Sequence, residues 1–222
     1  GNNVAVGSGA LLVATTAADN TAIGTLALTA NSSGTDNTAV GYAAGDANTT
    51  GSDNTFIGDN AGGANTTASN NTAVGSGALL LTTGDENVAV GSASLDANTT
   101  GGQNVAVGYL SLSANTTASN NTAVGYAALT ANTTGANNVA LGYATLDAST
   151  TTSNNTAIGY NALTANTTGA SNVAVGSNAL LVNTTGTQSV AVGAYSLDAN
   201  TTGASNVAMG YAALGANTTG IN

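Results

Sequence analysis

Serine and threonine are the most abundant potential nucleophiles in this sequence, and neither has a residue nearby that could activate it. The chain of 222 residues contains no His, Lys, Arg or Cys, whereas a Ser or Thr nucleophile needs a neighbouring base. Two carboxylates could share acid–base work, but only Asp85 and Glu86 are adjacent, and turn residues surround them. The sequence therefore predicts no catalytic residues and no enzyme activity.

The ten acidic residues are the remaining candidates for a metal site. Calcium-binding β-rolls carry the nonapeptide G-G-x-G-x-D-x-U-x, and this sequence has nothing like it. Single carboxylates such as Asp19, Asp36 and Asp53 lie among turn residues, where Asp is favoured for conformational reasons. We expect no metal site and no cofactor.

The charge balance excludes two classes of partner. The net charge is −10, and no cationic side chain is present, so the chain cannot neutralise phosphates or anionic lipid headgroups. The longest apolar runs, such as residues 77–81, are far shorter than the roughly 20 residues that span a bilayer. We expect neither nucleic-acid binding nor membrane insertion.

A repeated core organises the sequence. Each copy has the form N-(T/V)-A-(V/I)-G, and thirteen copies follow at a spacing of 17 residues, with one interval of 16 between Asn71 and Asn87. Counted from that Asn, position five is Gly in all thirteen copies, position three is Ala in twelve and position nine is Leu in eleven. A fixed period marks a repeat protein whose neighbouring copies pack on each other. We expect one continuous, uncapped domain, residues 1–222, that is a segment of a longer fibre.

Each repeat predicts one coil of an all-β solenoid. Seventeen residues are too few for a helix pair, and the core T-A-V-G is short and β-branched, with turn residues on both sides. We expect a second strand at positions six to eleven, residues 126–131 in one copy. Two short strands per coil, stacked about 4.8 Å apart, would make a β-roll of about thirteen coils, roughly 60 Å long.

One irregular copy indicates which side chains face inward. Phe56 replaces Ala at position three, and the same copy has Gly62 where Leu normally occupies position nine. Protein interiors conserve volume, so both positions are predicted to share one packed space. Gly at position five would either fit that narrow interior or adopt a turn conformation closed to other residues.

Alternation along the strand then turns positions two and four outward. Position four is always apolar, and a long exposed apolar stripe normally marks an interface. We therefore expect the chain to associate with itself along this stripe. The expected interface residues are Val6, Ile23, Val40, Ile57, Val74, Val90, Val107, Val124, Leu141, Ile158, Val175, Val192 and Met209.

Asparagine recurs at two places in the repeat, at position one and in the sequence N-T-T. Stacked amides at these places are expected to form ladders that satisfy backbone groups of the turns. N-T-T also matches the N-glycosylation acceptor, which leaves modification in the natural host as an alternative. The N-T-T asparagines in question are Asn48, Asn98, Asn132 and Asn166.

Aspartate recurs at position ten in every third coil, as Asp46, Asp96, Asp147 and Asp198. This pattern indicates duplication of a three-copy block. The spacing would also separate like charges by more than a Debye length of about 10 Å.

Two columns could form a binding face. Tyr109, Tyr126, Tyr143 and Tyr160 occupy position six in four successive coils. They could bind a cell-surface glycan, or they could pack across strands and stiffen the fold. Regular Thr pairs in the turns suggest ice binding, but a flat two-row array needs T-x-T on one strand. Glycan and ice binding stay open as alternative functions.

The unit N-T-A-V-G-Y-x-A-L-x-x-N-T-T-G resembles repeats in long phage and bacterial proteins with tail-fibre domains. It is also similar to the left-handed β-roll of trimeric autotransporter adhesin heads, whose core N-S-V-A-I-G is close to residues 155–159. The similarity covers the whole chain. It implies a parallel homotrimer joined through the Val/Ile strand, and the 17-residue unit implies larger turns than those of the adhesin repeats.

These features predict a structural fibre or filament segment. The expected setting is extracellular, at a cell or virion surface, as the rigid shaft or head of an adhesin or of a viral or phage-like tail fibre. A single-chain solenoid that stacks end to end into a polymer is the alternative. The absence of Lys and Arg would deny trypsin-like proteases a cleavage site in either case.

Overall fold

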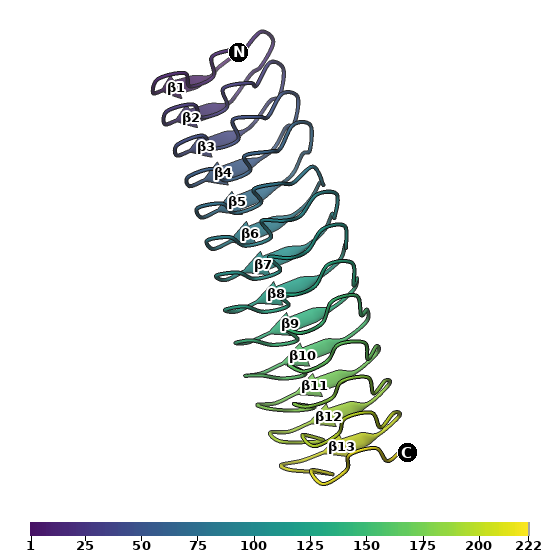
Figure 1. Cartoon of the computed structure of the whole chain (residues 1–222). Coiled ribbons are helices and arrows are strands. Elements are labelled where there is room, and N and C mark those ends of the chain that lie inside the picture. The colour runs from purple at the N-terminus through teal and green to yellow at the C-terminus, as the bar shows by residue number, and fades with distance from the viewer. Residues whose placement is uncertain (222) are drawn as a thin grey trace. The chain divides into compact units, whose positions relative to one another are not determined.

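The computed structural model describes residues 1–221, and within them the chain forms strands and turns without any helix. The chain groups into two compact units. The first contains residues 1–109 and 115–117, and the second contains residues 110–114 and 118 onward. Each unit is an all-β parallel solenoid with one strand per coil (Figure 1).

Each strand is three residues long and occupies positions two to four of its repeat. The first unit holds β1 (Val4–Val6), β2 (Thr21–Ile23), β3 (Thr38–Val40), β4 (Thr55–Ile57), β5 (Thr72–Val74), β6 (Val88–Val90) and β7 (Val105–Val107). The second unit holds β8 (Thr122–Val124), β9 (Val139–Leu141), β10 (Thr156–Ile158), β11 (Val173–Val175), β12 (Val190–Val192) and β13 (Val207–Met209).

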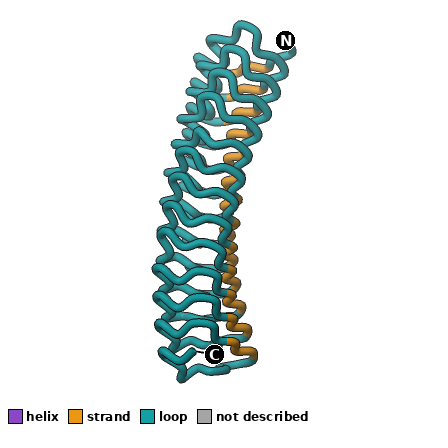
Figure 2. Tube along the Cα trace, turned by 90° about the vertical axis from the view of Figure 1, so that its right-hand side faces the viewer, coloured by secondary structure: helices purple, strands orange, loops and turns teal. Residues whose placement is uncertain are grey.

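Neighbouring strands within each unit pair in parallel without a shift of register. Ala39 pairs with Phe56 in the first unit, and Ala123 pairs with Ala140 in the second. Residues at the same repeat position therefore stack in columns from coil to coil. Figure 2 shows the strands of each unit along one side, with turns and loops making up the rest of each coil.

The prediction of a second strand at positions six to eleven is wrong. Residues 126–131 form a turn segment in which Ala127 and Leu129 have φ of 52° and 55°. Positions seven and nine have positive φ in every coil, and a strand requires extended φ throughout. The segment still bonds between coils, since the Leu129 N–H donates to the Thr145 carbonyl at 3.0 Å.

The predicted inward positions are confirmed. Positions three and nine are buried from the second coil to the twelfth, as Ala123 and Leu129 illustrate. Position eight, which the sequence did not single out, contributes a further column of small buried residues such as Ala128. The interior is thus a thin layer of Ala and Leu, which leaves little room for larger side chains.

Phe56 confirms that positions three and nine share one space. Its ring is fully buried, and a Cβ built on Gly62 would lie 2.4 Å from ring atoms along one edge. A Cβ built on Gly45, at position nine of the preceding coil, would lie 2.5 Å from the opposite edge. Phe56 therefore fills volume that two Leu side chains fill in other coils.

The shortened coil has lost a residue from its turn. Thr82 takes the place of Asn at position twelve, because Asn98 Nδ2 donates to its hydroxyl at 3.2 Å. Only Thr83 then separates Thr82 from Gly84, where other coils have two residues. The strands on either side keep their register, so the deletion flips no side chain from one face to the other.

Candidate association surface and its surroundings

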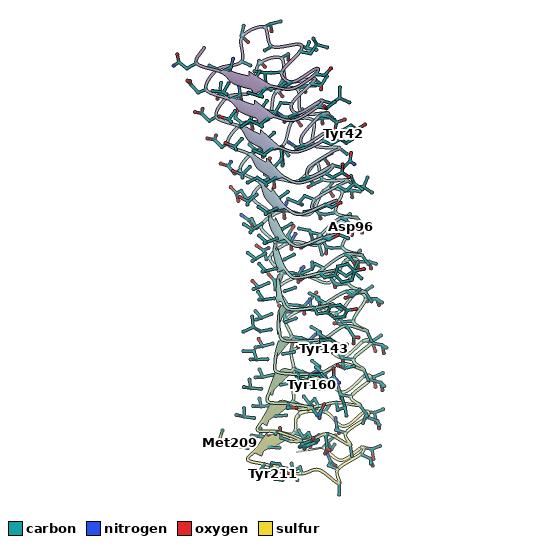
Figure 3. The ribbon with its side chains drawn as sticks, turned by 90° about the vertical axis from the view of Figure 1, so that its left-hand side faces the viewer. Tyr42, Asp96, Tyr143, Tyr160, Met209 and Tyr211 are labelled. Atoms are coloured by element: carbon teal, nitrogen blue, oxygen red, sulfur yellow. The ribbon has the colours of Figure 1, made fainter. Side chains whose placement is uncertain are left out.

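The expected interface residues lie on the outer side of the strands, as one column in each unit. Strands β1 to β7 contribute Val6, Ile23, Val40, Ile57, Val74, Val90 and Val107, and strands β8 to β13 contribute Val124, Leu141, Ile158, Val175, Val192 and Met209. These side chains are half-buried or exposed; Leu141, for example, is 40% exposed. Figure 3 shows Met209 projecting outward from the strand side of the second unit. Their role in association stays a prediction.

The strand face is free of charge in both units. Position two adds only Thr or Val beside the apolar residue at position four. All acidic residues occupy other repeat positions, and Figure 3 shows Asp96 on the far side of the first unit from the strands. Each unit therefore presents one neutral face in a chain whose ionisable side chains are anionic or tyrosine.

Asparagine at position one forms the predicted ladder. The backbone N–H and Nδ2 of Asn37 both donate to Asn20 Oδ1 at 3.0 Å, and Nδ2 also donates to the Gly51 carbonyl at 2.9 Å. Asn37 Oδ1 in turn accepts from the Asn54 backbone N–H at 3.0 Å. Each buried amide therefore satisfies backbone groups of its own coil and of the next.

Asparagine at position twelve forms a second ladder. Asn48 Nδ2 donates to the Gly51 carbonyl at 3.0 Å and to Asn31 Oδ1 at 3.2 Å. Because these amides are enclosed, the glycosylation alternative is contradicted: a glycan on Nδ2 would need a surface position. The four N-T-T asparagines Asn48, Asn98, Asn132 and Asn166 are all fully buried.

Breaking the position-one ladder should weaken the fold. We expect Asn37→Ala to lower the free energy of unfolding by about 1–3 kcal/mol, because it removes the acceptor of the buried Asn54 N–H. Asn37→Ser should cost less, since Ser189 natively holds position one and its hydroxyl accepts from the Asn206 N–H at 3.2 Å. Urea unfolding followed by circular dichroism measures both, and equal losses would contradict this account.

Three of the position-ten carboxyls lie in partly enclosed surroundings. Desolvation by burial raises the pKa of Asp46, Asp96 and Asp147, and backbone N–H donors from the same turn oppose this shift without cancelling it. The chain has no Lys, Arg or His that could offset the buried negative charge. The origin of the three-coil period in block duplication stays a prediction.

Acidification should therefore stabilise the fold. A carboxyl whose pKa is raised above the ordinary value of 3.8 binds its proton more tightly in the folded state. Its contribution to stability is fully present below that value and is lost as the pH rises through the raised pKa. We expect a higher melting temperature near pH 3 than near pH 7. Replacing Asp46, Asp96 and Asp147 together by Asn should reduce the difference, and a melting temperature that falls on acidification would contradict it.

Part of the tyrosine column is a stack of rings. The ring centroids of Tyr126 and Tyr143 lie 5.1 Å apart with planes 7° from parallel, and those of Tyr143 and Tyr160 lie 5.4 Å apart at 15°. Tyr109 belongs to the first unit and is about half exposed, as are the other three. Stacking covers the ring faces that a sugar would use, so this geometry agrees with packing between coils.

The paired Thr residues lie in turns, as the sequence suggested. The Thr49 hydroxyl donates to the Thr66 carbonyl at 2.9 Å, and the Thr184 hydroxyl donates to the Thr201 carbonyl at 3.0 Å. These hydroxyls therefore support the backbone of the next coil. No described strand carries T-x-T, so the strands themselves present no two-row Thr array.

The adjacent carboxylates Asp85 and Glu86 support turns as well. Asp85 Oδ1 accepts from the Ser69 N–H at 2.7 Å, and Glu86 Oε2 accepts from Gln103 Nε2 at 2.9 Å. Among residues 1–221, no group of three metal-ligating side chains comes together. The same residues contain no helix long and apolar enough to cross a membrane.

Comparison with protein-family models, with curated proteins and with solved structures finds no match to this chain. The functional argument therefore rests on the stacked coils, their neutral strand faces and their enclosed amide ladders.

Proposed function

We propose that this chain is a structural segment of an extracellular fibre or filament, the rigid shaft or head of an adhesin or of a viral or phage-like tail fibre. In this proposal three parallel copies associate through the outer face of their strands. The observation that carries it is the column of apolar side chains at position four, half-buried or exposed in both units on a face without charge. Exposed apolar surface that continues over many coils is typical of an interface.

The interior supports a mechanical role. Side-chain ladders and backbone hydrogen bonds join successive coils within each unit, and networks in which buried polar groups are satisfied make a structure rigid. Such a solenoid transmits force along stacked coils and needs no reactive group. The stacked Tyr rings add stiffness under this proposal, and their covered faces favour it over glycan binding.

The proposal predicts that mild polar substitutions on the strand face will abolish association. Leu141→Ser with Ile158→Ser should shift the protein from trimer to monomer in sedimentation equilibrium, because both side chains are expected to lie at the contact between copies. Secondary structure should be retained, since the positions are partly exposed in the single chain. The matched control is Thr130→Ser with Thr164→Ser at position ten, on the side of the coil opposite the strands, which we call the opposite wall. A wild-type protein that sediments as a monomer would overturn the proposal.

A further inference from the structure

The acidic residues are distributed unevenly between the two units. Eight of the ten precede residue 110, and Asp147 and Asp198 are the two that follow it. The difference is concentrated at position seventeen, the last residue of the repeat. In the first unit this column includes Asp19, Asp36, Asp53 and Glu86, whereas in the second unit it contains Asn120, Asn137, Asn154, Ser171, Gln188 and Ser205.

Position seventeen lies directly beside the strand face. Asp36, for example, is exposed and is separated from Thr38, the first residue of β3, only by the buried Asn37. Two residues of chain place its Cα within about 7.6 Å of the strand. Its backbone is fixed, with φ of 60° and its N–H donating to the Ala18 carbonyl of the preceding coil at 3.2 Å. Position seventeen therefore forms a rigid margin along the strands.

We propose that copies of this chain associate through the strand face of the second unit, β8 to β13, and that the carboxylates at position seventeen exclude the strand face of the first unit from this contact at neutral pH. The occupant of the second face is a second copy of the chain. This inference rests on the proposed function and states which part of the strand face performs it.

Electrostatic repulsion is the reason why the two strand faces would differ in association. Parallel copies bring equal coils together, so each position-seventeen carboxylate would approach the same carboxylate of its partner. Successive coils are about 4.8 Å apart, less than a Debye length of about 8 Å at physiological salt, so Asp19, Asp36 and Asp53 repel as a group. No cationic side chain is present to neutralise them. In the second unit the margin is neutral, and both carboxylates, Asp147 and Asp198, lie at position ten.

Position ten is on the opposite wall of the coil from the strands. The shared space of positions three and nine shows this, because the Phe56 ring extends from β4 to the Cα of Gly62 at position nine. A charge at position ten therefore lies away from the strand face. Native coils carry Asp there, as at Asp96 and Asp147, so further Asp residues at this position provide a control with the same charge.

The test exchanges Asn and Asp at the margin in the full chain. Asn137→Asp with Asn154→Asp should weaken self-association at least about tenfold at low salt, and about 1 M NaCl should restore most of it. Backbone strain does not enter, because Asp53 and Asn137 already adopt φ of 58° and 59° at this position. Thr130→Asp with Thr164→Asp adds the same charge on the opposite wall. Because it also places aspartates on both sides of Asp147 and removes two hydroxyl bonds between coils, its circular dichroism must first match that of wild type; association should then stay within about twofold. Sedimentation equilibrium at neutral pH measures all three proteins.

The reverse exchange tests the first unit. Asp19→Asn, Asp36→Asn, Asp53→Asn and Glu86→Gln together should extend the contact into β1 to β7. Association should tighten, and hydrogen exchange of these strands should become slower than the bonds between coils of one chain already make it. Margin and control variants that weaken association equally would overturn the proposal while leaving the fibre function in place. So would slower hydrogen exchange of β1 to β7 in the unmodified oligomer than in its dilute monomer. A wild-type chain that stays monomeric would overturn both the proposal and the fibre function.

Discussion

Replacing Gly41 by Ala should destabilise the first unit by about 3 kcal/mol or more, the largest effect that we expect from adding one methyl group. Gly41 has φ of 141°, and a Cβ on it would lie 2.4 Å from the Gly58 carbonyl oxygen of the next coil. Strain and steric overlap therefore act together, and the obstacle is backbone, which cannot rotate away. Of the two alternatives that the sequence left open for position five, the conformational one holds: these glycines have positive φ, and the space that excludes a side chain is taken by the backbone of the next coil, not by the interior between positions three and nine. Thermal unfolding followed by circular dichroism measures the loss.

Two further glycines separate these causes. Gly210 has a similar φ of 124°, but a methyl group added to it would have no atom within 4 Å, so Gly210→Ala should show the conformational cost alone. Gly77, at position seven, has φ of 65° and open space, and Ala127 holds the same position at 52°. Gly77→Ala should therefore stay within about 1 kcal/mol of wild type. A loss for Gly41→Ala no greater than that for Gly77→Ala would contradict the packing described here.

Replacing Phe56 by Ala should cost about 3–5 kcal/mol, the range for removal of a buried aromatic ring. The cavity would be large because Phe56 occupies the space of two Leu side chains, above Gly45 and Gly62. The backbone around it cannot collapse easily, since the strands on both sides are fixed in register. Urea unfolding of the full chain measures this loss.

The shared space also predicts which substitutions should restore the stability lost in Phe56→Ala. Adding Gly45→Leu and Gly62→Leu to Phe56→Ala converts two irregular coils to the common pattern and should recover most of the stability. Leu holds position nine with φ near 50° elsewhere, as Leu79 does, so the backbone accepts it. Gly62→Leu with Phe56 retained should destabilise by overlap with the ring. Additive effects of the three changes would contradict a shared space, because contacting residues show coupling.

Much of the coil could be predicted because thirteen copies expose each position to the same constraint. The strands at positions two to four, the inward Ala and Leu, the amide ladders and the turn that lost a residue all follow from residue type and period. Phe56 and Gly62 indicated that positions three and nine face each other, because a gain of side-chain volume at one position was balanced by a loss at the other.

The path of the other wall could not be predicted from residue types. Ala127 and Leu129 adopt left-handed φ, a conformation that Ala and Leu disfavour as isolated residues. Hydrogen bonds to neighbouring coils and burial of Leu129 impose it. The enclosure of Asn132, which contradicts the glycosylation alternative, also depends on this path. Neither the left-handed backbone nor the enclosure of Asn132 can be recognised from the local sequence, because both are imposed by contacts with neighbouring coils.

The ladders have a consequence for how such a chain is built and lengthened. The amide ladders of the regular array join residues 17 apart, as between Asn37 and Asn20, and backbone bonds between coils join residues at nearly the same separation. Each added coil therefore closes loops of similar length and loses similar conformational entropy. Folding can then proceed by addition of one coil to a formed template, while synthesis continues. Duplication of a block of coils supplies every new residue with its partners. The number of coils can therefore change during evolution without any change in the residues of the core.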